Sequence, residues 1–147
     1  MKPLRVFSLL TFAFIAIGCS PSGPDIASVK GTVTMDGKPL EYATVIFIPT
    51  SGGRPAVART DKEGQYELRF SGGRMGTIPG LNKVRITTVR DPGEDEDGNP
   101  IPGSKETIPM EYNQTSKLEF SVEDGKENVA DFPLESGGKI LSGNDGY

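Results

Sequence analysis

Residues 31–49 read GTVTMDGKPLEYATVIFIP, and this stretch decides the fold. Its first part alternates valine and methionine with threonine, which is the period-two pattern of a strand with one buried face, so a strand is predicted over residues 29–35. Asp36-Gly37 then supplies the two residues that a tight hairpin turn favours. Residues 42–48 are β-branched or aromatic on both faces, as in a central strand, and Pro49 ends the run.

The same alternation continues along the chain. It predicts five further strands, at residues 56–60, 65–70, 83–88, 117–123 and 128–134. Seven short strands without an amphipathic helix favour an all-β fold, a seven-stranded antiparallel β-sandwich, and the lack of crossover helices argues against parallel pairing. The predicted domain spans residues 26–136, and the tail at 137–147, rich in glycine, is expected to be disordered.

Composition excludes several classes of protein. The 147-residue chain has 16 Lys and Arg, 20 Asp and Glu, one Cys, no His and no Trp. A net charge of −4 and the lack of a basic stripe argue against nucleic acid as a partner. Ser-His and Cys-His catalytic pairs and His-ligated zinc sites are unavailable. We therefore expect neither an enzyme nor a cofactor.

The first 18 residues are typical of an export signal. Lys2 and Arg5 form a positive start, and residues 6–17 form an apolar run too short to span a bilayer. The run ends at Ala16-Ile17-Gly18-Cys19, which resembles the bacterial lipobox, whose cysteine receives a diacylglycerol thioether before cleavage. Lipidation at Cys19 predicts an anchored lipoprotein of the bacterial cell envelope, facing the periplasm or the cell surface. The alternative is a chemically idle cysteine in an ordinary helix.

The segment after Cys19 reads SPSGPD, and its proline and glycine content disfavours both helix and central strand. Residues 19–25 are therefore predicted to be the lipidated cysteine and a flexible tether. Two or three acyl chains at its start would hold the protein stably at a membrane, whereas one chain would not.

Residues 31–49, together with RTDKEGQYELRF at 59–70, resemble the carboxypeptidase regulatory-like, or transthyretin-like, domain. The matching positions are Gly31, Val33, Gly37, Pro39, Leu40, Ala43, Val45, Thr60, Asp61, Gly64 and Tyr66. Residues 108–122 and 128–134 look like the end of the same domain in many small bacterial lipoproteins. The resemblance implies a transthyretin (prealbumin)-like sandwich in which Asp61 caps a turn, Gly64 takes a positive φ and Tyr66 fills the core. It implies no activity, because the urate-degrading members depend on histidines.

The long segment at residues 91–109 is the candidate ligand-binding loop. It begins with five acids within seven residues, and Asp95, Asp97 and Asn99 are candidate Ca²⁺ ligands. The spacing fails the EF-hand pattern because Pro100 stands where glycine is required. The alternative is a solvated acidic loop without metal.

Three other positions carry hypotheses. Tyr112 is the candidate for stacking on a sugar, with a packing role as the alternative. Asn113-Gln114-Thr115 fits a glycosylation sequon, which chance explains better in a bacterial-type lipoprotein. Lys30 and Asn128 would form an intramolecular isopeptide if their strands were neighbours and an acid lay beside them.

The sequence thus predicts a non-enzymatic, lipid-anchored cell-envelope protein that acts as a structural or interaction module. Its expected partners are the membrane, through the lipid anchor, and an envelope protein or polysaccharide. The alternative is an envelope ligand-binding domain for Ca²⁺, a glycan or a peptide, using residues 91–109.

Overall fold

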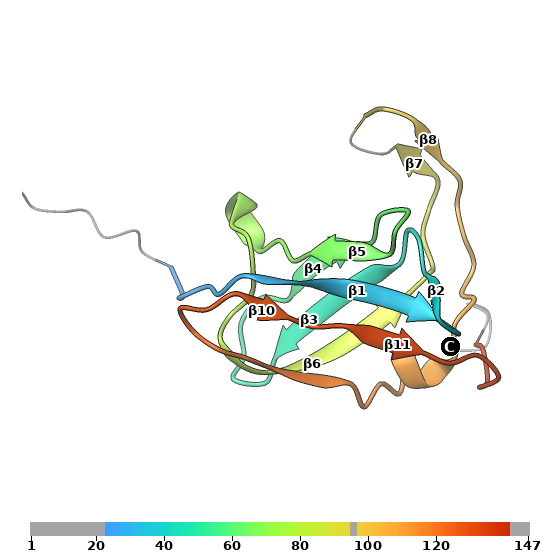
Figure 1. The fold of residues 1–147 in the computed structure, drawn as a ribbon. Helices are drawn as coiled ribbons and strands as arrows, with labels where there is room; N and C mark the ends of the chain where they lie inside the picture. The colour runs from blue at the N-terminus through green and yellow to red at the C-terminus, as the bar shows by residue number, and fades with distance from the viewer. Residues whose placement is uncertain (1–22, 95–96, 142–147) are drawn as a thin grey trace, which may run out of the picture.

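The computed structural model describes residues 23–94 and 97–141, and the described chain is an all-β, sandwich-like fold (Figure 1). The strands are β1 (Val29–Met35), β2 (Lys38–Pro39), β3 (Thr44–Pro49), β4 (Ala56–Arg59), β5 (Gln65–Glu67), β6 (Gly80–Thr87), β7 (Gly93–Glu94), β8 (Pro100–Ile101), β9 (Glu119–Val122), β10 (Asn128–Val129) and β11 (Phe132–Leu134). Two 3₁₀ turns, η1 (Ser71–Gly73) and η2 (Met110–Tyr112), complete the elements. The expected signal segment and Cys19 lie outside the described residues.

The first sheet is built around β1. On one side β1 pairs antiparallel with β5 and β2, and on the other it pairs parallel with β10 and β11. The antiparallel expectation is therefore wrong for the first and last strands. Parallel strands need a long crossover connection, and here the rest of the domain supplies it, with two short 3₁₀ turns and no α-helix among the described residues.

The β1–β2 hairpin confirms the predicted turn. Met35 pairs with Lys38, so Asp36 and Gly37 form a two-residue loop. Their φ angles are 49° and 77°, the positive pair that a type I′ turn requires.

Between β10 and β11, the backbone at Ala130 comes very close to Gly31 of β1. A Cβ on Gly31 would lie 1.9 Å from the carbonyl oxygen of Ala130, so only glycine allows β1 to pass here. One residue further on, the Thr32 N–H donates to the Asp131 side-chain oxygen at 2.8 Å. A carboxylate thus replaces a backbone acceptor, and the parallel ladder is interrupted without leaving this donor unsatisfied.

The second sheet is antiparallel throughout, in the order β4-β3-β6-β9. β3 lies between two neighbours, which confirms the prediction of a central strand. Only one of its faces is fully buried, however, because Val45 and Phe47 point into the core and Ile46 and Ile48 are partly exposed.

The core between the sheets is aromatic at its centre. Phe47 meets Phe120 and Phe132 edge to face, with ring centroids 6.0 and 6.2 Å apart. Tyr66 stacks on Phe132 at 6.5 Å, and its hydroxyl donates to the carbonyl of Ala130 at 2.7 Å. In the last predicted strand, residues 128–134, the alternate residues Ala130, Phe132 and Leu134 are all buried.

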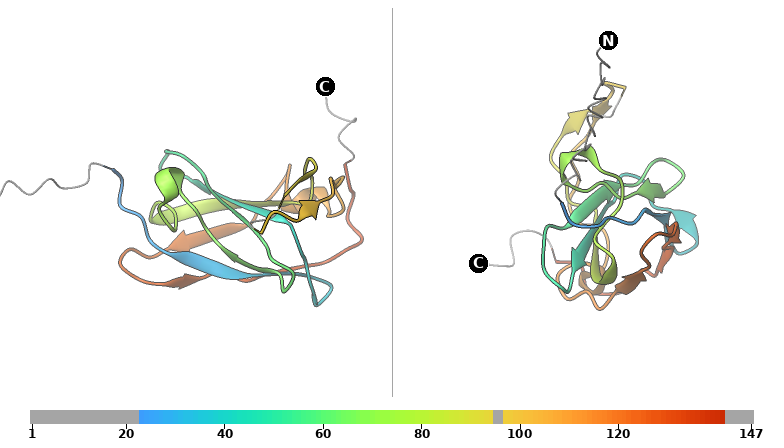
Figure 2. Two further views of the ribbon diagram at one scale, coloured as in Figure 1. Left: turned by 90° about the horizontal axis from the view of Figure 1, so that it is seen from above. Right: turned by 90° about the vertical axis from the view of Figure 1, so that its left-hand side faces the viewer.

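The described residues of the segment 89–105, namely 89–94 and 97–105, are called the arm below and project from the body between β6 and η2 (Figures 1 and 2). β7 and β8 pair antiparallel within the arm. At its base the backbones of Arg90 and Ser104 exchange hydrogen bonds of 3.0 and 2.9 Å, and Arg90 Nε donates to the Pro102 carbonyl at 2.9 Å. The arm is therefore built on a hydrogen-bonded base.

Both ends of the described chain are fastened to the body. Arg74 Nη1 donates to the carbonyl of Pro24 at 2.9 Å, within the expected tether. In the expected tail, the carbonyl of Lys139 accepts a hydrogen bond of 2.8 Å from the Met110 N–H, so the described part of that tail packs against η2. The two attachments lie at opposite ends of the sandwich (Figures 1 and 2).

Candidate functional site: a groove beneath the arm

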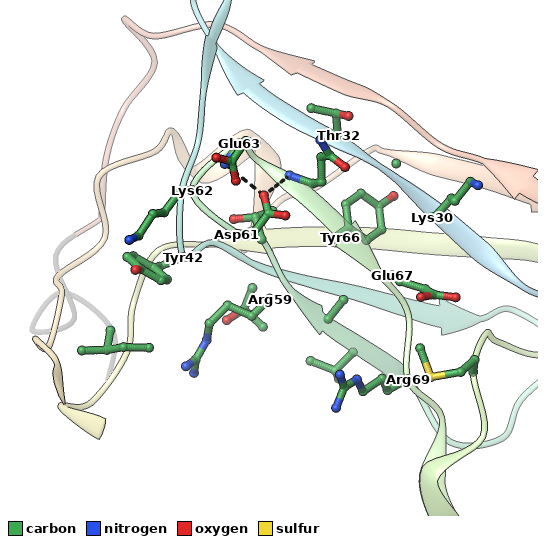
Figure 3. A pocket seen from close by; sticks show the side chains of 18 of the residues that line it. Lys30, Thr32, Tyr42, Arg59, Asp61, Lys62, Glu63, Tyr66, Glu67 and Arg69 are labelled. Carbon is green, nitrogen blue, oxygen red and sulfur yellow. Dashed lines mark hydrogen bonds between the residues drawn. The ribbon is translucent and has the colours of Figure 1, made fainter. Parts of the chain in front are cut away.

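A groove of about 1140 Å³ lies between the arm and the outer face of β1, β4 and β5. Figure 3 shows the polar side chains that line it, with Tyr42 and Arg59 towards one end and Arg69 towards the other. The groove draws its walls from segments as far apart in the sequence as Lys30 and Asp131. Its shape therefore depends on the complete fold.

The floor of the groove is the segment from β4 to β5, where the chain passes from the second sheet to the first. Val57 and Arg69 exchange backbone hydrogen bonds of 3.1 and 3.0 Å, and the chain between them turns at residues 61–65. The Asp61 carboxylate accepts from the backbone N–H groups of Glu63 and Gln65 at 3.0 and 2.8 Å. The capping role that the family resemblance implied for Asp61 is thus present.

Gly64 supports the same turn. Its φ is 75°, and a Cβ at this position would lie 2.5 Å from the carbonyl oxygen of Val33. Glycine is required here both by the backbone angle and by the approach to β1. The implied positive φ of Gly64 is confirmed.

Tyr42 is the aromatic side chain at the junction of floor and arm. Its φ of 55° is costly for a bulky residue, on the order of 1 to 3 kcal/mol, and persists only where surrounding contacts hold it. Those contacts are a hydrogen bond of 3.1 Å from its N–H to the Thr60 carbonyl and the Arg90 guanidinium stacked 5.3 Å from its ring centroid. Tyr42 is therefore fixed against the base of the arm.

Thr60 fixes the corner beneath Tyr42. Its side chain is buried, its hydroxyl donates to the Leu40 carbonyl at 2.6 Å, and it accepts from the Ala43 N–H at 2.8 Å. These bonds tie β4 to the segment that leads into β3. The buried hydrogen bonds of Thr60, which directly follows β4, thus help to hold Tyr42 in its position.

The arm supplies the second wall through Glu94, Asp97, Asn99 and Ile101. Two of the three candidate Ca²⁺ ligands, Asp97 and Asn99, therefore line one groove, and the third, Asp95, lies outside the described residues. Among the residues that the structure describes, no group of three or more acidic or cysteine side chains gathers as a metal site.

The electrostatic character of the groove is mixed. Arg59 and Lys62 project beside Asp61 and Glu63, and Lys30 on β1 forms an ion pair with Glu127. The hydrogen bond and charge of Glu127 hold the pKa of Lys30 above its usual value. Both signs of charge, threonine hydroxyls and a fixed aromatic ring together suit a polar chain held by hydrogen bonds and stacking better than a simple ion.

Sequence reasoning missed the cluster that fastens the arm to β6. The partly buried Glu106 carboxylate accepts from the Thr87 hydroxyl at 2.6 Å and from the hydroxyl and N–H of Thr88 at 2.8 and 3.0 Å. Burial acts to raise the pKa of Glu106, but these hydrogen bonds together hold the pKa below its usual value. No local sequence motif indicates this contact, because Glu106 lies 18 residues from Thr88 and 19 residues from Thr87.

Tyr112 is a packing residue. It packs against the hydrophobic core, and its hydroxyl accepts a hydrogen bond of 3.1 Å from the Glu135 N–H. The stacking hypothesis for Tyr112 is not supported, because Tyr112 does not line the groove, whereas Tyr42 and the buried Tyr66 do. Asn113 is 4% exposed and its amide donates to the Pro109 carbonyl at 3.3 Å, so the sequon is closed to a glycan in the folded domain.

Lys30 and Asn128 do lie on paired strands, as the isopeptide hypothesis required. The Asn128 amide nitrogen, however, donates to the carbonyls of Ser28, Glu123 and Lys126. The Lys30 ammonium instead contacts Glu127 in solvent. The two side chains therefore have separate partners, and the isopeptide hypothesis is wrong.

Within residues 23–94 and 97–141, none of the helical segments has the length and hydrophobicity needed to cross a bilayer. Compared with known proteins, the chain matches no family model, no curated sequence and no solved structure.

Proposed function

We propose that this protein is a non-enzymatic lipoprotein of the bacterial cell envelope, a transthyretin-like β-sandwich that acts as a structural or interaction module at a membrane surface. The observation that carries the proposal is the position of the only cysteine. Cys19 ends an apolar run of signal-peptide length and stands four residues before the first residue of the described domain. After acylation and cleavage, the anchor and the folded body would be joined by a very short segment.

The test is the fate of Cys19→Ser in a bacterial host. We expect the variant to leave the membrane fraction, while the wild-type protein and Ser20→Ala partition into detergent, because only Cys19 can carry the acyl chains. Mass spectrometry of the mature wild-type N-terminus should show a diacylglyceryl cysteine. A Cys19→Ser protein that is cleaved and still partitions into detergent would refute the lipoprotein assignment.

The second candidate function is binding of an envelope polysaccharide or peptide in the groove. The specific observation in its favour is that Tyr42, held at a costly φ, lies in one groove with the arm residues Asp97 and Asn99. Tyr42→Asn removes the ring and keeps a side chain that tolerates the left-handed region. Purified peptidoglycan should retain wild-type protein and the outlying variant Lys139→Gln more strongly than Tyr42→Asn; equal retention of all three would argue against this use of the groove.

A further inference from the structure

The outward side chains of β4, β3, β6 and β9, called the open face below, lie on the side of the second sheet away from the core. Along β4 and β6, buried and exposed residues alternate, as expected when one face of an antiparallel sheet is solvated. Several of these outward side chains are apolar: Val57 is 42% and Leu81 is 44% exposed, and Ile46 and Ile48 are only partly buried. The open face is therefore not an ordinary polar surface.

The apolar side chains of the open face form a stripe along β3. Ile46 is paired with Val57 on β4, and both point outward. Ile48 follows on the same face of β3, and the Leu81 carbonyl of β6 accepts a hydrogen bond of 2.9 Å from the N–H of Thr50, the residue after β3. The outward positions of these four strands hold no aromatic residue.

Cations border the stripe on the side of β6 and β9. Lys83 is paired with Glu119, so two positions along the same ladder Arg85 and Lys117 are neighbours. Like charges opposite each other on a sheet are unfavourable, and the acceptor that Arg85 Nε contacts at 3.0 Å is neutral, the Asn113 carbonyl. Glu119 is the only acidic residue within the four strands, which contain three cations.

The stripe has a cation on its other side as well. Arg59, the last residue of β4, points outward and also borders the groove. Acidic groups at the margins are engaged or lie further away: the Glu106 carboxylate accepts from two threonine hydroxyls, and Glu123 and Asp124 follow the end of β9, where Lys126 forms an ion pair with Glu123. The middle of the open face is thus positive in a chain whose net charge is −4.

An α-helix matches the width of the open face. Strands lie about 4.8 Å apart, so the β4 and β6 margins are about 10 Å from each other, close to the helix diameter of about 10 to 12 Å. A helix along β3 would place apolar residues on the stripe and acidic residues against the cations on both sides. A planar layer of lipid headgroups fits less well, because Ile46 and Ile48 are partly buried and shorter than the flanking Lys and Arg side chains. A sugar chain would find no aromatic ring on which to stack.

We propose that the open face binds an amphipathic helix of a partner protein, with acidic residues on both sides of the apolar stripe of that helix. This inference deepens the proposed role as an interaction module and rests on it, but it requires neither the lipid anchor nor the groove. Burial of the stripe supplies the attraction, and the cations select the partner because a helix with basic flanks would be repelled.

The test replaces Leu81 or Ser121, which are paired on the open face, with benzoylphenylalanine in the full chain in the producing bacterium. Lys38, exposed on β2 of the first sheet, is the control site. After irradiation, mass spectrometry identifies the crosslinked segment. We expect both open-face sites to capture one partner segment that has apolar residues at helical spacing with Asp or Glu beside them, and Lys38 not to capture it. A crosslink to lipid, to glycan, to a second copy of this chain or to a segment without acids, or a yield no higher than at Lys38, would overturn the proposal.

Two charge variants act in opposite directions. Lys117→Glu places an acid beside Arg85 and should lower the crosslinking yield at Leu81 several-fold, whereas Glu119→Gln should raise it. Because Lys117→Glu also removes a like-charge contact, its melting temperature should not fall, and a lower yield therefore cannot come from unfolding. Lys139→Glu, outside the open face, is the control. Equal yields in all three variants would contradict the role of the cations.

The anchor and the open face can fail separately. If Cys19→Ser protein stays in the membrane fraction while the charge-dependent crosslink at Leu81 persists, the lipoprotein assignment is wrong and the docking proposal stands. If Cys19→Ser protein leaves the membrane fraction and Leu81 in the wild-type background captures no acidic helix, the docking proposal is wrong and the anchor stands.

Discussion

Tyr66 follows directly after the turn at residues 61–65, and its side chain is buried in the core. Burial raises the pKa of its phenol far above the usual value, and its hydroxyl donates to the Ala130 carbonyl beside the gap between β10 and β11. Tyr66→Phe keeps the ring and removes that bond. We expect a loss of about 0.5 to 1.5 kcal/mol in the free energy of unfolding, measured with urea. Tyr112→Phe is the matched control because Tyr112 is less buried. An equal loss of unfolding free energy in both variants would mean that the hydrogen bond to Ala130 does not contribute specifically to stability.

Glu106 makes the stability of the arm depend on pH. Because its pKa is lowered in the folded state, its contribution is present above the unfolded pKa and is lost as the pH falls through the folded pKa. Glu106→Gln should therefore melt below wild type at about pH 7, and the gap in melting temperature should narrow as the pH falls through the folded pKa, where the wild-type carboxyl also becomes neutral.

Melting curves across this range check the prediction, with the exposed Glu111→Gln as control. A gap in melting temperature of the same size throughout this range would show that Glu106 acts by packing and not by its charge.

At the scale of single residues, the sequence was informative where structure is local. Asp61 and Gly64 occupy the turn roles that the family resemblance implied, and such roles are local because a turn is made by neighbours in the chain. Tyr42 and Glu106 were not predicted. Their environments come from Arg90, Thr60 and Thr88, and no pattern within either segment encodes contacts across strands.

Gly31 is the residue at which β1 approaches the chain between β10 and β11. Gly31→Ala would place a methyl group 1.9 Å from the Ala130 oxygen, so β1 must move away from β10 and β11. We expect a loss of at least about 1 to 3 kcal/mol, the usual cost of overpacking, measured by chemical denaturation. Gly93→Ala in the arm is the control because a Cβ there meets nothing within 4 Å. Similar midpoints for the two variants would contradict the close approach.

The arm is expected to be separable from the sandwich. Deleting residues 93–99 removes β7 and leaves the pair between Arg90 and Ser104, and surface loops change closure entropy only slowly with length. The melting temperature should stay close to that of wild type both in chelator and in millimolar Ca²⁺. If Asp95, Asp97 and Asn99 organise a cation, wild type alone should gain several degrees in Ca²⁺, since a ligand of the native state stabilises it by mass action.

At the scale of elements, the alternation of apolar and polar residues predicted the positions of most strands but not which strands pair with one another. The predicted strands at 29–35 and 83–88 correspond closely to β1 and β6, and β3 is central as its composition indicated. Period two carries no information on direction, however, so the parallel pairing of β1 with β10 and β11 was missed. The β7–β8 ribbon was missed because two-residue strands are too short to show a period.

At the scale of the whole molecule, the first and last strands hold the sandwich together. β1 and the residue before it accept hydrogen bonds from residues about 100 positions away: Asn128 N–H donates to the Ser28 carbonyl and Ala130 N–H to the Lys30 carbonyl. Phe132 and Leu134, which fill the core beside Phe47, arrive with the same segment. The closed core therefore includes this long-range pairing, and domains dominated by such non-local contacts fold slowly.

Truncation tests this dependence directly. A chain that ends after Ser136 keeps β10 and β11 and loses the contact between Lys139 and Met110, so it should fold with a modestly lower melting temperature. A chain that ends after Glu123 loses Phe132 and Leu134 and exposes one edge of β1, and removing either large core side chain alone typically costs about 2 to 5 kcal/mol of a total near 5 to 15. It should lack near-ultraviolet circular dichroism and a cooperative melting transition. If the shorter chain melted cooperatively, the four-stranded sheet would be a folding unit by itself, and the parallel pair would be an addition to the fold instead of its closure.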